Sequence, residues 1–137
     1  NHENYDDMST LRVDRIAHIT VLSERRKPLR EIKGYQQQRT FNVSQYVKEH
    51  IYMFGGESIT VSFKAKRSIV NQILDWFDGN VEFSDVTPDD VVCRVRVNHH
   101  AFKYWALQYM QSVKVLSPAS LVTEVKEAIK EGLQQYS

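Results

Sequence analysis

From residue 58 onward, the alternation of apolar and polar side chains predicts a regular order of strands and helices. Ile59, Val61 and Phe63 alternate with polar residues, which is typical of a half-buried strand. The next apolar residues recur at helical spacing, and the turn residues 78–80 end the predicted helix. The apolar stripe of this helix comprises Ile69, Val70, Ile73, Leu74 and Phe77.

A second strand is predicted from Val81, followed by a turn at 87–90 and a third strand over 91–97. The third strand places Cys93 and other apolar residues on one face and two arginines on the other. Asn98 is a suitable N-cap for a second helix. The inner stripe of that helix comprises Ala101, Phe102, Trp105, Ala106 and Tyr109.

The chain ends with a predicted strand and a predicted helix. Val113 and Val115 indicate the strand, and Ser117-Pro118 indicates a cap with proline at the first helical position. The residues expected to face inward on this helix are Leu121, Val122, Val125, Ile129 and Leu133. The order β-α-β-β-α-β plus a terminal helix predicts an α+β fold with the split-βαβ, ferredoxin-like arrangement, in which both main helices cover one sheet face.

The residues before this unit predict a single strand and a linker. Residues 9–22 are rich in β-branched side chains, and their alternation changes phase near Asp14, which indicates a bulge or bend. Because one strand cannot form a stable sheet, we expect it to pair with another copy of the chain or to lie disordered. Residues 24–33 hold five basic and two acidic side chains and indicate a solvated linker.

A helix is predicted over residues 42–54, between this linker and the first regular strand. Asn42 is its expected N-cap, and Phe41 and Tyr46 have the spacing of a hydrophobic staple. Gly55-Gly56 is expected to end the helix.

Length and composition bound the class of protein. With 137 residues, the chain suits one domain, or one domain with an appendage. The net charge of +1 excludes the bulk electrostatics of a general DNA-coating protein. A single cysteine, Cys93, excludes an internal disulfide framework, and no window approaches the roughly 18 apolar residues that span a bilayer. We expect a soluble cytoplasmic protein, and the polar start without methionine is interpreted as a fragment of a longer chain.

No group of residues indicates catalysis, a metal site or a cofactor. His99 and His100 are adjacent, and neither has an acidic or histidine partner four residues on, so a solvent-facing first turn is expected. Asp89-Asp90 follows a turn proline, and turn chemistry explains it better than an acid–base pair. We expect no enzyme activity and no cofactor, with Cys93 packed as a small apolar residue.

Two groups of basic residues are candidates for binding an anion. Arg94 and Arg96 share one face of the third strand and can bind an anion or a partner's carboxylate bidentately; the alternative is a sheet face kept soluble by charge. No aromatic residue accompanies them, so this face is a poor platform for stacking RNA bases. The second group lies in the linker and would be an electrostatic footprint for nucleic acid. It comprises Arg25, Arg26, Lys27, Arg30 and Lys33.

Several short motifs resemble those of a family of bacterial transcriptional regulators. Leu11-Arg12-Val13-Asp14-Arg15-Ile16 is similar to the closing strand motif of the WYL domain. Three later segments resemble the WCX extension that follows the WYL domain in these regulators. They are Asp75-Trp76-Phe77, Trp105-Ala106-Leu107-Gln108-Tyr109 and Val113-Lys114-Val115-Leu116-Ser117-Pro118.

This resemblance implies a regulatory role. In the family, an amino-terminal winged helix-turn-helix binds operator DNA, the WYL domain is a small Sm-like or SH3-like barrel that senses an effector, and the WCX domain contributes to dimerisation. Single-stranded DNA has been implicated as an effector for some members. The chain contains neither the winged helix nor the Trp-Tyr-Leu strand. Arg12 and Arg15 match basic positions of the WYL motif, and Arg15 is expected either to contact a phosphate or effector, or to pair with a carboxylate such as Asp14.

We therefore interpret residues 1–34 as the remnant of a WYL barrel, 35–57 as a linker with a helix, and 58–137 as a ferredoxin-like WCX domain. The expected function is that of an effector-sensing and dimerising C-terminal module of a DNA-binding regulator, without catalysis. Its expected partners are a second copy of the chain, operator DNA through the upstream winged helix, and single-stranded DNA or a small effector; no membrane is expected. The alternative is a self-contained domain that binds an anionic ligand or single-stranded nucleic acid.

Overall fold

The computed structural model describes residues 10–32, 35 and 40–137. These residues form four α-helices and four strands, in the order predicted from residue 58 onward, which confirms the α+β class. The elements are α1 (Val43–Glu49), β1 (Ser58–Lys66), α2 (Val70–Phe77), β2 (Val81–Ser84), β3 (Asp90–Asn98), α3 (His99–Gln108), β4 (Val113–Ser117) and α4 (Ala119–Gln134). None of the helices in the described residues is both long and apolar enough to cross a membrane.

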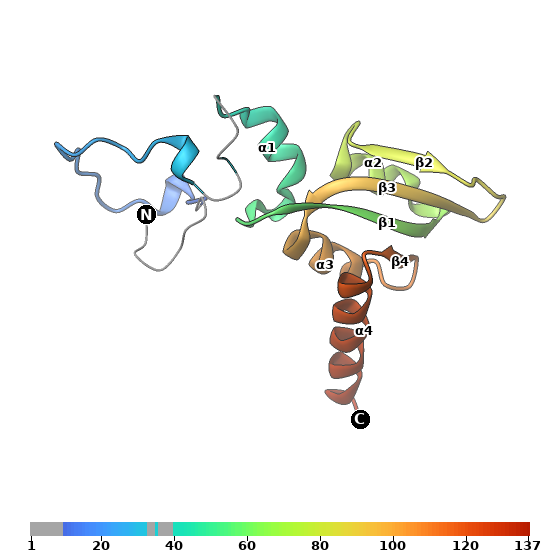
Figure 1. Ribbon diagram of the computed structural model, residues 1–137. Helices are drawn as coiled ribbons and strands as arrows, with labels where there is room; N and C mark the ends of the chain where they lie inside the picture. Colours follow the sequence, from blue (N-terminus) through green and yellow to red (C-terminus); the bar gives the residue numbers. More distant parts are fainter. Residues whose placement is uncertain (1–9, 33–34, 36–39) are drawn as a thin grey trace.

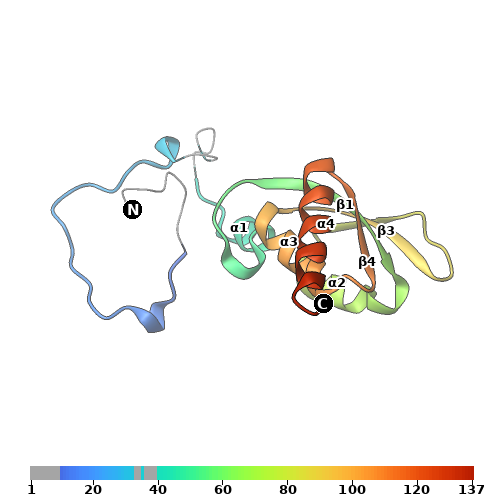
Figure 2. The same cartoon turned by 90° about the horizontal axis from the view of Figure 1, so that it is seen from below.

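The four strands form one antiparallel sheet in the order β2-β3-β1-β4. This order is compatible with the predicted ferredoxin-like arrangement. Phe63 of β1 lies opposite Cys93 of β3 and Val115 of β4, so the apolar residues of these strands share one face. Helices α2 and α3 pack on this face (Figures 1 and 2), where the ring of Phe63 lies 6.3 Å from that of Phe77 and 5.4 Å from that of Trp105. We call the opposite face of the sheet the open face.

The core between the sheet and its helices is rich in aromatic side chains. Its largest fully buried members are Trp105, Phe63, Phe77 and Phe102. Cys93 is also fully buried, and burial raises the pKa of its thiol to about 11. The prediction that Cys93 packs as a small apolar residue is therefore confirmed. Trp76 is half-buried and packs against the same core.

Helix α1 begins where it was predicted and ends earlier. The side chain of Asn42 accepts a hydrogen bond from the backbone N–H of Gln45 at 3.0 Å, which confirms the cap. The helix ends at Glu49 rather than at residue 54. Its buried successor, His50, leaves the helical conformation, and the backbone of Tyr52 and Met53 is left-handed, at φ 60° and 57°. The chain thus turns toward β1 before it reaches the two glycines, because the buried imidazole ring anchors the turn.

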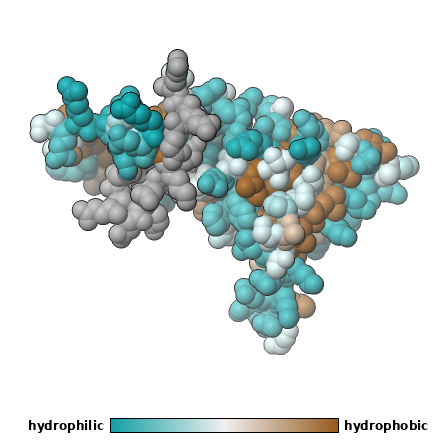
Figure 3. Space-filling model, viewed as in Figure 1, coloured by the Kyte–Doolittle hydropathy of each residue, from teal (hydrophilic) through white to brown (hydrophobic). Residues whose placement is uncertain are grey.

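Helix α4 extends past the sheet (Figure 1), and this corrects two of the predicted core positions. Leu121 and Val125 are buried as expected, but Ile129 is 40% exposed and Leu133 is 68% exposed. No element of the described chain reaches far enough to cover this end. The helix begins at Ala119, one residue later than predicted, so Pro118 is the N-cap rather than the first helical residue. Figure 3 shows the projecting part of α4 as mainly hydrophilic.

The strand predicted over 9–22 is not formed in the part of it that the structure describes, residues 10–22. These residues are exposed and form no strand, and a 3-10 turn at Val13–Arg15 confirms the bend predicted near Asp14. A strand needs a neighbour for its backbone hydrogen bonds, and no other strand of the described chain pairs with this segment. In the predicted linker, residues 24–32 are exposed except for the half-buried Leu29 and Ile32, and Lys33 lies outside the described residues.

The aromatic core predicts that buried side chains contribute much more to the free energy of unfolding than projecting side chains do. Phe63→Ala removes a fully buried ring that contacts both main helices, so we expect the free energy of unfolding to fall by about 3–5 kcal/mol. Leu133→Ala changes an exposed side chain, and we expect a change within about 0.5 kcal/mol. Urea unfolding followed by tryptophan fluorescence measures both. Equal losses in the two variants would contradict this description of the core.

Candidate functional site

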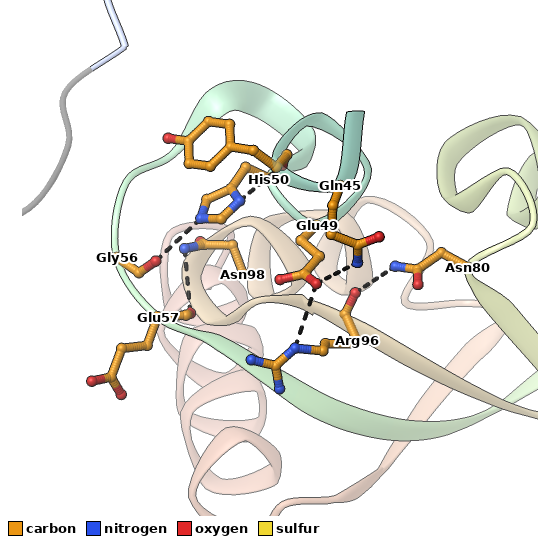
Figure 4. Close-up of polar contacts among 9 residues, drawn as sticks. Gln45, Glu49, His50, Gly56, Glu57, Asn80, Arg96 and Asn98 are labelled. Atoms are coloured by element: carbon orange, nitrogen blue, oxygen red, sulfur yellow. Dashed lines mark hydrogen bonds and ion pairs between the residues drawn. The ribbon is translucent and has the colours of Figure 1, made fainter. Parts of the chain in front are cut away.

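An ion pair between Arg96 and Glu49 joins the end of α1 to the open face of the sheet (Figure 4). Nε of Arg96 lies 3.5 Å from Oε1 of Glu49, and the side-chain amide of Gln45 donates a hydrogen bond to the same oxygen at 2.5 Å. The Glu49 side chain is 13% exposed, whereas that of Arg96 is 55% exposed. A carboxylate so far removed from water depends on its two donors. Arg96 therefore contacts α1 while much of its side chain stays exposed on the open face of the sheet.

Two buried polar side chains fix the loop between α1 and β1. The ring nitrogens of His50 lie 2.9 Å and 3.2 Å from the carbonyl oxygens of Tyr46 and Gly56. The side-chain amide of Asn98 donates to the carbonyl of Gly55 at 3.1 Å, and its oxygen accepts from the backbone N–H of Ala101 at 3.0 Å. Asn98 was predicted as the cap of α3, which these contacts confirm. The same side chain also bonds the loop between α1 and β1. Asn98 therefore links this loop to the first turn of α3.

Arg96 lines three hollows, and the smallest of them lies against α1. The first, which we call the sheet-face hollow, has a volume of about 370 Å³ and is lined by Thr60, Asn80, Glu82, Arg94, Val95 and Arg96. The second, which we call the junction hollow, has a volume of about 280 Å³ and is lined by Tyr35, Glu49, His50, Gly56, Glu57, Ser58 and Arg96. A group that binds Arg96 in the first hollow thus acts on a residue that also lines the second.

The open face carries more positive than negative charge. Lys64 pairs with Asp90 at 2.8 Å. Lys114 lies directly opposite Lys64 on the neighbouring strand, and neither Lys114 nor Arg94 has an ion-pair partner among the described residues. Like charges directly opposite each other are unfavourable. This face is accordingly suited to a negatively charged group.

The structure brings the described basic residues that were predicted to bind an anion together as two separate pairs. Arg94 and Arg96 line the same hollow, as their spacing predicted. Arg12 and Arg15 line another hollow, of about 500 Å³, in the segment that Figure 1 shows to one side of the sheet. In the same segment, the cluster Arg25, Arg26 and Lys27 is exposed and has no ion pair within the described part of the chain. Binding by any of these residues stays a prediction.

The pair considered between Arg15 and Asp14 is not formed, because Asp14 pairs with Arg12, and a pair of Arg15 with another carboxylate stays a prediction. Arg12 donates to both carboxylate oxygens of Asp14, at 2.9 Å and 2.5 Å. This contact raises the pKa of Arg12 and lowers the pKa of Asp14. Arg15 has no ion-pair partner among the described residues. Binding of a phosphate or an effector by Arg15 also stays a prediction.

The prediction of a solvent-facing pair of histidines is wrong for His99. Its Nε2 lies 2.8 Å from Oε1 of Glu124, and Nζ of Lys103 lies 3.6 Å from the other oxygen of that carboxylate. The hydrogen bond from His99 is the main reason that the pKa of Glu124 is lowered. This cluster joins α3 to α4, and a partner 25 residues away could not be found from local spacing. Across the described residues, no group of three or more ligating side chains is placed to hold a metal ion.

Sequence reasoning missed Glu49, Asn80 and Glu82. Glu82 lies directly opposite Arg94 in the β2–β3 pairing, so counting back from the turn at 87–90 would have found it. The side-chain amide of Asn80 donates to the backbone carbonyl of Arg96 at 2.7 Å, and the sequence carries no signal for that contact.

Comparison with known proteins identifies the family. A family model described as WCX domain matches residues 55–133, from the loop before β1 to the last turn of α4. The chain belongs to the WCX-domain family. WCX domains occur in regulators that carry a WYL domain, so a transcription-regulator context is supported. A comparison with curated proteins finds no match.

The lowered pKa of Glu124 predicts a pH-dependent contribution to the stability of the WCX domain. Because this pKa is lower in the folded than in the unfolded chain, its contribution is present above the ordinary carboxyl pKa of about 4.3 and is lost as the pH falls through the folded value. We expect Glu124→Gln to lower the free energy of unfolding by at most about 1 kcal/mol at pH 6, because the pair is partly exposed. The difference should shrink as the pH falls through the folded pKa of Glu124.

Urea unfolding at a series of pH values measures this difference. Glu127→Gln is the matched control, since Glu127 is exposed on the same helix and has no ion pair among the described residues. A loss in Glu124→Gln that persists unchanged at low pH would show that the carboxylate charge is not responsible.

Proposed function

We propose that the chain is the effector-sensing and dimerising C-terminal module of a bacterial DNA-binding transcriptional regulator, and that it acts without catalysis. The match of the WCX family model to residues 55–133 carries this proposal, because WCX domains occur in WYL-domain regulators. The motif at 11–16, which resembles the end of a WYL domain, supports the same context. Operator DNA would be bound by a winged helix upstream of this sequence.

The junction at Arg96 supports a role in transmitting a signal along the chain. Helix α1 lies between the WYL-like motif and the WCX domain, and its last residue, Glu49, contacts the sheet through Arg96. His50 and Asn98 hold the following loop in place. A change in the position of α1 would therefore be passed directly to β3, and a change at the open face would be passed back to α1.

The projecting end of α4 supports dimerisation. Ile129, Leu133 and Tyr136 are exposed and continue the apolar stripe that Leu121 and Val125 bury in the domain. Helical spacing places Lys126 on one flank of this stripe and Glu131 on the opposite side of the helix. We propose that the exposed stripe pairs with the same stripe on α4 of a second copy.

Sedimentation equilibrium of the whole chain tests the dimer. We expect the apparent mass to rise from the monomer value of 16.0 kDa toward twice that value as concentration increases. The double variant Ile129→Glu, Leu133→Glu should remain monomeric, because each copy would place two carboxylates in the contact. Gln134→Glu, on the opposite side of the helix, is the control and should dimerise as the unmodified chain does. A mass of one chain at every concentration, or equal dimerisation of the double variant, would contradict the proposed contact.

A second candidate function is binding of single-stranded nucleic acid by the exposed linker cations. Arg25, Arg26 and Lys27 have no carboxylate partner among the described residues. Binding of a labelled oligonucleotide that weakens steeply with salt, and that is lost when these three residues are replaced by alanine, would favour this candidate.

A further inference from the structure

The sheet-face hollow contains an unpaired positive charge and an unpaired negative charge on neighbouring strands. Glu82 of β2 lies directly opposite Arg94 of β3, and Thr60 of β1 lies directly opposite Arg96. All four side chains line the hollow. Residues directly opposite in a sheet have Cβ atoms about 4.5–5.5 Å apart, so Glu82 and Arg94 are within reach of each other. No ion pair joins them, and neither has another ion-pair partner among the described residues.

A hydrogen bond from the uncharged side chain of Asn80 also helps to fix the shape of the hollow. The side chain of Asn80 donates to the backbone carbonyl of Arg96, which ties the turn after α2 to β3 (Figure 4). Asn80 therefore forms a fixed wall beside Arg96. Arg94 and Arg96 project from the same face of one strand at positions i and i+2, so both side chains line the sheet-face hollow.

We propose that the sheet-face hollow binds a small zwitterion, such as a free α-amino acid, as an effector. Its carboxylate would bind between Arg94 and Arg96, its ammonium group would bind Glu82, and the hydroxyl of Thr60 is available for a further hydrogen bond. The inference deepens the proposed regulatory function, and it rests on that function for the ligand's role as an effector.

The charges of the hollow decide among classes of ligand. A guanidinium group binds a carboxylate through two parallel hydrogen bonds. Glu82 would repel a phosphate dianion or the backbone of a nucleic acid, whereas it attracts an ammonium group. A volume of about 370 Å³ lies at the low end for small-molecule sites, and the lining is polar rather than apolar. A ligand that carries both charges on a small frame satisfies every one of these features.

Binding in this hollow would compete directly with the contact that holds α1. Arg96 lies 3.5 Å from Glu49, the last residue of α1. A ligand carboxylate that binds the edge of Arg96 formed by Nε competes with the carboxylate of Glu49, because Nε carries a single N–H and is the nitrogen that Glu49 contacts. Occupancy of the hollow is thereby coupled to the attachment of α1, and the coupling acts in both directions.

The test is a titration of the ¹⁵N-labelled whole chain, followed by amide chemical shifts. The probes are the twenty standard L-amino acids added one at a time, with acetate, methylammonium and inorganic phosphate as single-charge controls. We expect at least one amino acid to cause saturable shifts at residues that line the sheet-face hollow, with an affinity at least tenfold above that of any control. Arg94→Gln and Glu82→Gln should each weaken this binding at least tenfold.

The charge argument also predicts opposite effects of one variant on two probes. Glu82→Gln should weaken the amino acid and strengthen inorganic phosphate, because the repulsion of the anion is removed. Two outcomes would overturn the site: no saturable shift with any amino acid, or phosphate bound as tightly as the best amino acid. These side chains are exposed, and an unchanged amide spectrum without ligand shows that each variant is folded.

A second pair of variants tests the coupling to α1. Glu49→Gln removes the competitor for Arg96, so we expect it to bind the amino acid several-fold more tightly than the unmodified chain does. Glu57→Gln is the matched control, since Glu57 lines the junction hollow and has no ion pair with Arg96. Equal affinity in the two variants would overturn the coupling. If the chain dimerises in sedimentation while no amino acid binds, this inference fails and the proposed function does not.

Discussion

The two faces of the sheet have opposite requirements, and the rest of the structure depends on this constraint. An antiparallel sheet covered by helices on one side must place its apolar residues on that side and its charged residues on the other. Strands β1 and β3 meet this requirement, with Val61, Phe63 and Cys93 fully buried while Lys64 and Arg94 are exposed. A shift of one residue in the pairing would exchange the two sets. The register thus determines both the aromatic core and the position of every charge on the open face.

The candidate site follows from the same register. Glu82, Arg94, Arg96 and Thr60 lie together because their strands pair as they do, and they need no active-site loop to assemble them. In the described chain, helix α1 contacts this face through an ion pair between Glu49 and Arg96. That contact places the linker helix and the candidate ligand site on one side chain. A regulatory domain with this arrangement can link occupancy to the position of the segment before it.

The sequence allowed the regular part of this fold to be predicted, because its pattern is local. Alternation revealed β1 and β3, and the cap residues Asn42 and Asn98 revealed where two helices begin. The end of α1 was missed because it depends on the buried ring of His50, whose carbonyl partners are fixed by the folded loop. Ile129 was wrongly placed in the core because a helical stripe does not show where the domain ends.

The candidate site was only partly predictable. Arg94 and Arg96 were found from spacing along one strand, whereas their partners come from other elements. Predicting the place of Glu82 requires the register of β2. Predicting that of Glu49 requires the packing of α1 against the sheet, which no local pattern encodes. The ion pair of His99 with Glu124 was missed for the same reason.

The ion pair of Arg96 with Glu49 holds α1 to the open face of the sheet. A double-mutant cycle of Glu49→Gln and Arg96→Gln, measured by urea unfolding, tests this contact most directly, because the cycle isolates the interaction between the two side chains. We predict a coupling energy of about 0.5–1 kcal/mol that stabilises the folded chain. Losses that simply add in the double variant would show that the two residues do not interact, and would contradict this role of the ion pair.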